Sequence, residues 1–301
     1  MDLQQTIAKS VTVEGIGLHS GQPSRITLSP APSGFGIVFQ TSAPYRTLIP
    51  ATPENVVDSH FATTLGVNGS RVQTVEHLLA AAGALGINDL LVEMEGDEVP
   101  ALDGSAKPFA ALLQDAGRVA QPLPREPLVI TKPIRVGDES RWLQILPSPE
   151  FRISYTLDLD HPAVPTQAAS FLCTEQVFLD ELASARTYGF LKDVGMLRKN
   201  GLAKGGSLEN AVVVGRRVIL NGDLRFQDEF VRHKILDLIG DLALLGRPVL
   251  GHVVARNAGH ALNHQLVLAI QRALREEQPR NGAVARGGRQ GSQLAPDLAA
   301  R

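Results

Sequence analysis

Residues 121–127 (QPLPREP) contain three prolines in seven positions and divide the chain into two parts that begin alike. In the first part, KSVTV at 9–13 leads into a β-type segment that ends in LSPAP at 28–32. In the second part, KPIRV at 132–136 leads into a segment that ends in LPSP at 146–149. Each part then passes from alternating β-type segments to a helical pattern. The repeated order of elements favours an internal duplication of one α+β unit.

We therefore expect an α+β fold with a first domain over residues 1–122 and a second over 123–279. The chain has 301 residues, of which 44% are hydrophobic, and this is enough for two domains that each have a core. The stretch 280–301 is rich in Gly, Arg and Gln and has no apolar periodicity. This composition predicts a disordered tail.

Composition and charge exclude several classes of protein. A net charge of −2 and an aromatic content of 5% give no basis for nucleic-acid binding. Cys173 is the one cysteine, so the chain has no internal disulfide and no cysteine-based zinc finger, and Cys173 is predicted to be a core residue. The first fifteen residues lack the apolar core of a signal peptide, and no apolar run is long enough to span a bilayer. We expect a cytoplasmic protein without a transmembrane segment.

Helical patterns extend over 74–84, from the turn at 103–105 to Gly117, over 228–245, and from Ala261 to Gln278. Thr74 is the predicted N-cap of the first helix, because its hydroxyl can accept a hydrogen bond from a free amide. Gly246, with Pro248 beyond it, ends the third helix.

The helix over 228–245 carries an unusual polar stripe. His233, Asp237 and Asp241 follow each other at i, i+4 steps and so lie on one face. A solvated face of an amphipathic helix is the ordinary interpretation. However, Phe230 and Leu236 flank the stripe, so the helix is apolar nearly all round and is expected to be buried. Buried carboxylates need a partner or a metal, which favours a site here.

A histidine and a carboxylate one turn apart can both reach a single metal ion. Catalytic zinc usually has three protein ligands and a water, so a third ligand must come from elsewhere in the chain. The best candidate is the pair Glu76-His77 in the first turn of the helix over 74–84. A solvated pair at a helix start is the alternative. The sequence has no H-E-x-x-H motif of the metalloproteases.

Two further histidines lie in loops that could line a cleft. His260 follows Gly259 at a loop-to-helix junction, and Asp241 could keep its imidazole charged. An ordinary surface or core histidine is an equal alternative for His260. His19 lies in the glycine-rich segment GIGLHSG at 15–21, which suits close ligand approach or a plain hairpin.

The segments RTYGF at 186–190 and GLAKGGS at 201–207 flank several apolar residues. They do not have the spacing of a P-loop. An inserted hairpin with an apolar lining would give a lipid chain a place to lie, and a simple packing extension is the alternative.

Seven segments together resemble the UDP-3-O-acyl-N-acetylglucosamine deacetylases, the zinc amidases that commit Gram-negative bacteria to lipid A synthesis. The segments are GIGLHSG at 15–21, TVEHL at 74–78, DGSA at 103–106, SARTYGF at 184–190, GGS at 205–207, FVRHKILDLIGD at 230–241 and GHALN at 259–263. No single string is decisive, but all of them in this order are highly specific. They extend over nearly the whole chain except the tail.

The resemblance implies a role for each matching residue. It implies metal ligands at His77, His233 and Asp237, with Glu76 as general base. It implies transition-state support from His260 with Asp241 as its partner, and an oxyanion-binding hydroxyl at Thr187. It implies substrate contacts at Lys234, His19, Tyr188, Phe190, Gly206 and Ser207. Tyr188 stands where the family often has phenylalanine, which puts local substrate contacts in question but not the reaction.

The resemblance also implies a fold and an activity. The fold consists of two duplicated β-α-α-β-type domains packed as a sandwich around a cleft, each with an insert. The insert of the second domain, near 186–214, forms the acyl-chain passage. The activity is zinc-dependent hydrolysis of the N-acetyl group of an acylated UDP-amino sugar, with Fe²⁺ able to replace zinc in the cell and with a monomer expected. The alternatives are a zinc peptidase, a non-catalytic scaffold clamped by zinc, and a sugar-nucleotide binding module.

Overall fold

A computed structural model describes residues 2–42 and 46–277 of the protein and shows two main sheets. The first sheet has the order β2 (Val11–Ile16), β3 (Pro23–Pro30), β9 (Leu90–Glu95), β4 (Ile37–Gln40) and β5 (Leu48–Pro50). The second has the order β12 (Ile134–Gly137), β13 (Trp142–Leu146), β18 (Val249–Arg256), β14 (Phe151–Leu157) and β15 (Gln167–Leu172). The short strand β11 (Leu128–Val129) also pairs with β18.

The two sheets share one topology. In each, the strand that arrives last in the chain occupies the centre, pairs parallel with one neighbour and antiparallel with the other, and the outer pairs are antiparallel. The α+β class is thus confirmed. The domain bounds 1–122 and 123–279 stay a prediction, and the predicted tail over 280–301 lies outside the described residues.

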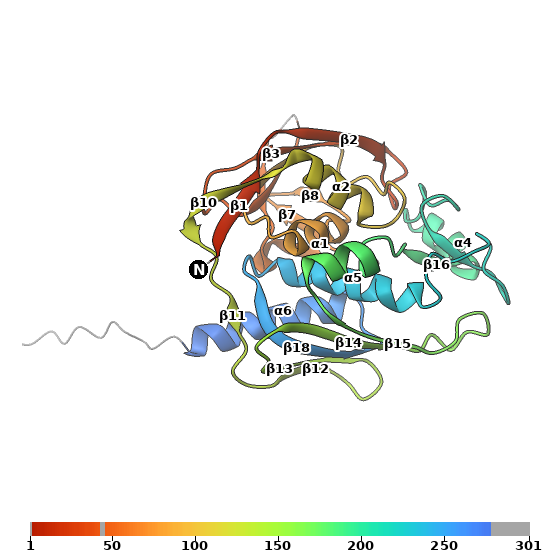
Figure 1. Cartoon of the computed structure of the whole chain (residues 1–301). Coiled ribbons are helices and arrows are strands. Elements are labelled where there is room, and N and C mark those ends of the chain that lie inside the picture. Colours follow the sequence, from red (N-terminus) through yellow and green to blue (C-terminus); the bar gives the residue numbers. More distant parts are fainter. Residues whose placement is uncertain (1, 43–45, 278–301) are drawn as a thin grey trace, which may run out of the picture.

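Four helices lie between the two sheets (Figure 1). They are α1 (Glu76–Ala84), α2 (Lys107–Ala116), α5 (Glu229–Ala243) and α6 (His260–Glu277). The helices α1 and α5 pack directly on each other at the centre. Small residues permit this approach, because a Cβ added at Gly240 would lie 2.0 Å from the carbonyl oxygen of Glu76. Residues at the first turn of α1 and the middle of α5 are therefore brought together.

Each half carries additional elements around this frame. In the first half, β1 (Leu3–Ile7) pairs antiparallel with β10 (Arg118–Pro124), and β6 (Val56–Asp58), β7 (Thr64–Val67) and β8 (Ser70–Val72) form a small sheet before α1. The 3₁₀ turn η1 (Pro53–Asn55) precedes β6. In the second half, the short α3 (Glu175–Val177) continues into η2 (Phe178–Leu182).

The insert of the second half projects from one end of the molecule (Figure 1). It contains β16 (Tyr188–Phe190), α4 (Leu191–Lys199) and β17 (Val212–Val214). The expected hairpin is wrong, because β16 and β17 pair in parallel. Parallel neighbours need a crossover, and the segment containing α4 provides it.

The predicted cap of the first central helix is also wrong. The helix α1 begins at Glu76, and Thr74 makes no capping bond to it. Thr74 instead has φ of 60°, which is unusual for a β-branched residue, and its hydroxyl donates to Glu98 at 2.8 Å. At the other boundaries, α5 ends at Ala243 rather than Leu245, and α6 begins at His260 rather than Ala261.

Two further expectations concern the burial of Cys173 and the absence of a transmembrane helix, and both can be compared with the described residues. Cys173 is partly buried against the core, and burial raises the pKa of its thiol to about 12, so the thiol stays protonated. Within 2–42 and 46–277, no helix combines the length and the apolar character needed to cross a bilayer.

Candidate metal centre

Two helices from opposite halves bring three potential metal ligands together. His77 comes from the first turn of α1, and His233 and Asp237 lie one turn apart on α5. The Nε2 atom of His77 is 3.6 Å from Oδ1 of Asp237, and Nε2 of His233 is 3.3 Å from the same oxygen. One ligand atom from each residue lies within 4.8 Å of the others. Atoms bound tetrahedrally to zinc at its usual bond lengths lie about 3.3 Å apart, so these three side chains can share one ion.

The chemistry of this cluster fits a cation. All three side chains are buried, and among the described residues Oδ1 of Asp237 has no hydrogen-bond donor. An unpaired buried carboxylate oxygen is costly, and a metal ion would offset that cost. Burial raises the pKa of Asp237, but the neighbouring His233, Lys234 and His260 hold it well below its usual range, so the carboxylate is ionised.

His233 is prepared for metal binding by its other ring nitrogen. Its Nδ1 lies 3.1 Å from the carbonyl oxygen of Ala185, a contact in which Nδ1–H donates. This tautomer leaves the lone pair of Nε2 free on the side of Asp237 and His77. Burial lowers the pKa of His233 to about 3, so the ring is neutral, as a metal ligand must be.

Glu76 lies beside the three ligands, at the first residue of α1. It is 3% exposed, and its Oε2 accepts a hydrogen bond from the amide of Thr63 at 3.1 Å. Its other oxygen, Oε1, is 3.7 Å from Nε2 of His260. Burial raises the pKa of Glu76, although His260 and His77 act in the opposite direction. A buried carboxyl with a raised pKa next to a metal site has the properties of a proton acceptor.

His260 and Asp241 form a buried pair on the other side of Glu76. The Nδ1 atom of His260 is 2.8 Å from Oδ2 of Asp241. Asn263 donates to the same oxygen at 2.8 Å, and the Thr63 hydroxyl donates to Oδ1. Burial lowers the pKa of His260, but Asp241, with Glu76 and Asp237, raises it more, to about 9. The ring is therefore an imidazolium at neutral pH, with Nε2 directed towards Glu76 and Asp237.

Lys234 and Tyr188 border the same cluster. The Nζ atom of Lys234 is 2.7 Å from Oδ2 of Asp237 and 5.5 Å from the centre of the Tyr188 ring. The Tyr188 ring meets the rings of Phe230 and His233 edge to face, at 4.9 and 6.3 Å between centroids. Burial raises the pKa of the Tyr188 hydroxyl, so it stays protonated.

The glycine-rich loop at 15–21 contacts the insert of the second half. The amide of Lys204 donates to the carbonyl of His19 at 3.1 Å, and that of Gly205 donates to Leu18 at 3.1 Å. A Cβ at Gly205 would lie 2.2 Å from the carbonyl oxygen of Gly17, so only glycine permits this contact. His19 is buried, and burial lowers its pKa although Glu98 acts in the opposite direction. Its Nε2 has no partner among the described residues.

Four expected site residues lie around the cluster rather than in contact with the ligands. The amide of Thr187 donates to Gly104 at 2.8 Å. The ring of Phe190 is 6.4 Å from that of Tyr188. Ser207 donates its amide to Asn210, and Gly206 lies close to Leu18. In the described part of the chain, these four have no hydrogen bond or ring contact with the three ligands.

Most of the chain is similar to one family of enzymes. A model of the UDP-3-O-acyl N-acetylglycosamine deacetylase family matches residues 4–272. The chain belongs to this family. A relative named UDP-3-O-acyl-N-acetylglucosamine deacetylase in Myxococcus xanthus is 53% identical, with 89% of this chain and 86% of the relative covered. Relatives of the same name in Syntrophotalea carbinolica and Oleidesulfovibrio alaskensis are both 48% identical, over 90% and 89% of this chain and 88% of each relative.

The structure of this deacetylase family member adds residues to the site residues that were predicted from its sequence. Thr63 connects Glu76, through its amide, to Asp241, through its hydroxyl. Nothing in the run Ala62-Thr63-Thr64 marks the middle residue, because its importance comes only from its position in space. Ala185 contributes through its backbone carbonyl, which every residue possesses. Neither residue could be found from its type.

Glu98 is a third addition, and it ties the glycine-rich loop to the segment before α1. Its Oε1 accepts from the amide of His19 at 2.9 Å and from the hydroxyl of Thr74 at 2.8 Å. Its Oε2 accepts from the amide of Ser20 at 2.8 Å. One buried carboxylate thus holds both His19 and the left-handed residue that precedes Glu76.

We expect Glu98→Gln to lower the free energy of unfolding by about 2–3 kcal/mol, because an amide cannot accept all three bonds and two of the donors, His19 and Thr74, are buried. Urea unfolding followed by circular dichroism measures the change. The control is Glu93→Gln on the exposed side of β9, which should change stability by no more than about 0.5 kcal/mol. Equal stability of the two variants would contradict the role given to Glu98.

Proposed function

We propose that this chain hydrolyses the N-acetyl group of UDP-3-O-acyl-N-acetylglucosamine, giving acetate and the free 2-amino sugar nucleotide, the committed step of lipid A biosynthesis. The observation that carries the proposal is the cluster of His77, His233 and Asp237 next to Glu76, in a chain that belongs to this deacetylase family. A zinc peptidase is disfavoured by the family membership.

The ion of this site is proposed to be zinc. Two imidazoles and one carboxylate are a ligand set that catalytic zinc uses, and Fe²⁺ accepts the same donors. When bound, zinc supplies a Lewis acid that polarises the amide carbonyl and makes water more acidic.

Glu76 is proposed as the general base. Its carboxylate oxygen Oε1 is free of the backbone bond that holds Oε2, so it can take a proton from the attacking water. Its raised pKa brings it closer to working pH, which favours both the acceptance and the later release of that proton. The water oxygen forms a bond to the carbonyl carbon, and the bond between that carbon and nitrogen then breaks.

His260 is proposed to stabilise the negative charge that develops on the carbonyl oxygen. Its imidazolium is held by Asp241, and its free Nε2–H points to the side of Glu76 and Asp237. The Thr187 hydroxyl is proposed as a second donor. The leaving nitrogen needs a proton, and either Glu76 or His260 can deliver it.

Substrate contacts are proposed for Lys234, His19, Tyr188, Phe190, Gly206 and Ser207. The contact between the loop at 15–21 and residues 203–205 supports this proposal, because its hydrogen bonds join the two halves at His19. The insert near 186–214 is proposed to receive the acyl chain, and the partly buried apolar residues of β16 and α4 support this role. The expectations of a monomer and of a cytoplasmic location stay predictions.

We expect Asp241→Asn to move the basic limb of the pH profile of kcat/KM to lower pH. The charge of Asp241 raises the pKa of His260, so the active imidazolium is present below about pH 9 and is lost as the pH rises through that value. Removing the charge lowers that limit. The measurement is acetate release between pH 6 and 10, and Asp138→Asn, an exposed carboxylate, is the control. An unmoved limb would contradict the pairing.

The function itself is tested by acetate release from the acylated UDP-sugar with and without a chelator. We expect release that stops with chelator and returns with zinc. A scaffold clamped by the ion would release no acetate and would unfold on chelation, and a binding module would bind the sugar nucleotide without any metal. Thermal unfolding measured in parallel separates these cases.

A further inference from the structure

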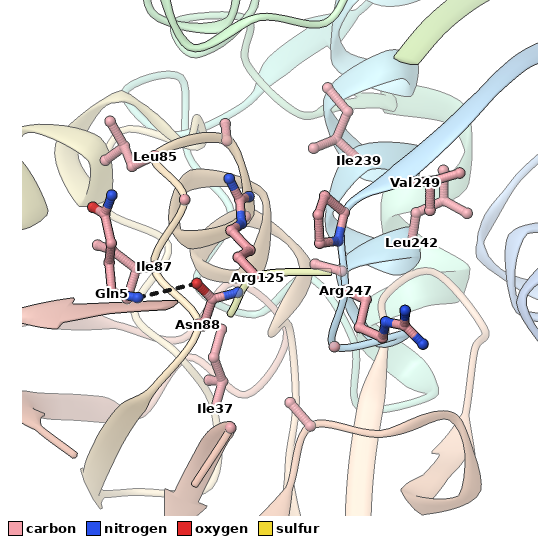
Figure 2. Close-up of a pocket in the computed structure, with 18 of the residues that line it drawn as sticks. Gln5, Ile37, Leu85, Ile87, Asn88, Arg125, Ile239, Leu242, Arg247 and Val249 are labelled. Atoms are coloured by element: carbon pink, nitrogen blue, oxygen red, sulfur yellow. Dashed lines mark hydrogen bonds between the residues drawn. The ribbon is translucent and has the colours of Figure 1, made fainter. Parts of the chain in front are cut away.

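A cavity lies between the two halves, away from the metal centre. It has a volume of about 450 Å³ and lies at the C-terminal ends of α1 and α5, whereas the ligands lie at the start of α1 and the middle of α5. Ile37, Leu85 and Ile87 line it from the first half, and Ile239, Leu242 and Val249 line it from the second (Figure 2). None of the three metal ligands, nor Glu76 or His260, lines it.

One cation that lines this cavity, Arg125, forms no ion pair with the described residues. Figure 2 shows Arg125 lying between Leu85 of the first half and Ile239 of the second. Among the described residues, its guanidinium makes no hydrogen bond or ion pair, and its Nε is fully buried without an acceptor. Burial lowers the pKa of Arg125, although Asp2 acts in the opposite direction. A partly buried charge is costly unless a partner compensates it.

The two other arginines of the cavity differ from Arg125. Arg118 donates to the carbonyl of Leu85 and to Glu175, both at 2.7 Å. Arg247 donates to the carbonyl of Glu126 at 2.9 Å. The guanidinium groups of Arg118 and Arg247 thus already donate some of their hydrogen bonds within the protein. Of the three, only the Arg125 guanidinium donates none to the described residues.

We infer that this cavity binds an amphipathic anion, whose carboxylate or phosphate group pairs with Arg125 and whose apolar body lies against the aliphatic walls. A guanidinium binds either group through two parallel hydrogen bonds. The volume is within the range of about 300–1,000 Å³ that small-molecule sites occupy. Asn88 adds a polar group nearby. Its Oδ1 accepts a hydrogen bond from the backbone amide of Gln5 at 3.2 Å, and its side-chain nitrogen takes no part in that bond (Figure 2).

The test is calorimetric titration of the full chain with four probes below their micelle concentrations. Decanoate and decyl phosphate carry the two anionic groups, decyltrimethylammonium carries the opposite charge, and acetate lacks the apolar body. We expect one saturable site for an anionic decyl probe, at least tenfold weaker binding of decyltrimethylammonium, and no measurable binding of acetate there. Stronger binding of decanoate or of decyl phosphate identifies the preferred head group.

Variants distinguish this cavity from the insert near 186–214, which is proposed to receive the acyl chain and could also take a decyl chain. Arg125→Met keeps the apolar stem and should weaken anion binding at least tenfold, whereas Arg125→Lys should retain part of it. Arg247→Gln is the matched control and should bind like the parent. All three should keep kcat and KM, since Arg125 lies outside the metal centre. Binding that survives Arg125→Met, or that only competes with the substrate, would overturn the inference.

Discussion

Replacement of Glu76 by Gln is expected to lower kcat by about 10²–10⁴-fold, the range that a positioned general base contributes. Glutamine has nearly the same shape and can still accept the hydrogen bond from the Thr63 amide, so α1 should keep its position. It cannot accept a proton from water. The three ligands are unchanged, and one zinc per chain should remain bound. Steady-state acetate release and elemental analysis of the same preparation measure the two quantities.

Asp89→Asn is the matched control for this substitution. Asp89 is also a buried carboxylate of the first half, but it accepts a hydrogen bond from the amide of Gly36 rather than facing the ligands. Its variant should keep kcat within a few-fold of the parent. If Glu76→Gln retained zinc and lost no activity, Glu76 would not be the base. If it lost zinc as well as activity, Glu76 would belong to the ligand set.

The second large effect is expected for His77→Ala. Substitution of a residue that only supports a ligand costs about 10–100-fold in metal affinity, and loss of a ligand itself should cost at least as much. The variant should therefore lose zinc on dialysis, and kcat/KM should fall by about 10³-fold or more, in line with the several kcal/mol that such an ion supplies. Zinc titration against a competing chelator measures the affinity directly.

His252→Ala is the control for loss of a histidine. Its Nε2 is 2.8 Å from the hydroxyl of Ser154 on the neighbouring strand, outside the metal centre. Its zinc content should equal that of the parent. His77 is the single ligand from the first half, so the same experiment tests whether the ion joins the two halves. Full zinc occupancy in His77→Ala would remove that residue from the ligand set.

The network around the cluster explains why these substitutions should be separable. The amide of Thr63 donates to one oxygen of Glu76. The hydroxyl of Thr63 donates to Asp241 and also lies 3.4 Å from Nδ1 of His260. Asn263 fixes the remaining oxygen of Asp241. Asp241 keeps the hydrogen bonds from Thr63 and Asn263 when Glu76 or His77 is replaced, so those substitutions need not displace the Asp241–His260 pair.

The sequence by itself determined the fold class, the family and the i, i+4 stripe of His233, Asp237 and Asp241, because helical periodicity is a local property of the chain. It could not decide whether Glu76 and His77 face water, since both lie off an apolar stripe. The structure buries them because α1 packs on α5 of the other half and on α2 of its own half. The cap at Thr74 failed for a related reason, since Glu98, distant in sequence, binds that hydroxyl first.

The remaining parts of the site depend on contacts between segments far apart in the chain. Thr63 contacts Asp241 from 178 positions away, and Glu98 contacts His19 from 79. The side chain of Arg125 could not be assigned to a cavity from the linker QPLPREP alone, because the walls around it come from both halves. Local patterns decided which residues are capable of the chemistry. Only the packing of α1 on α5 decided which of them meet, because that contact sets the distance between the two halves.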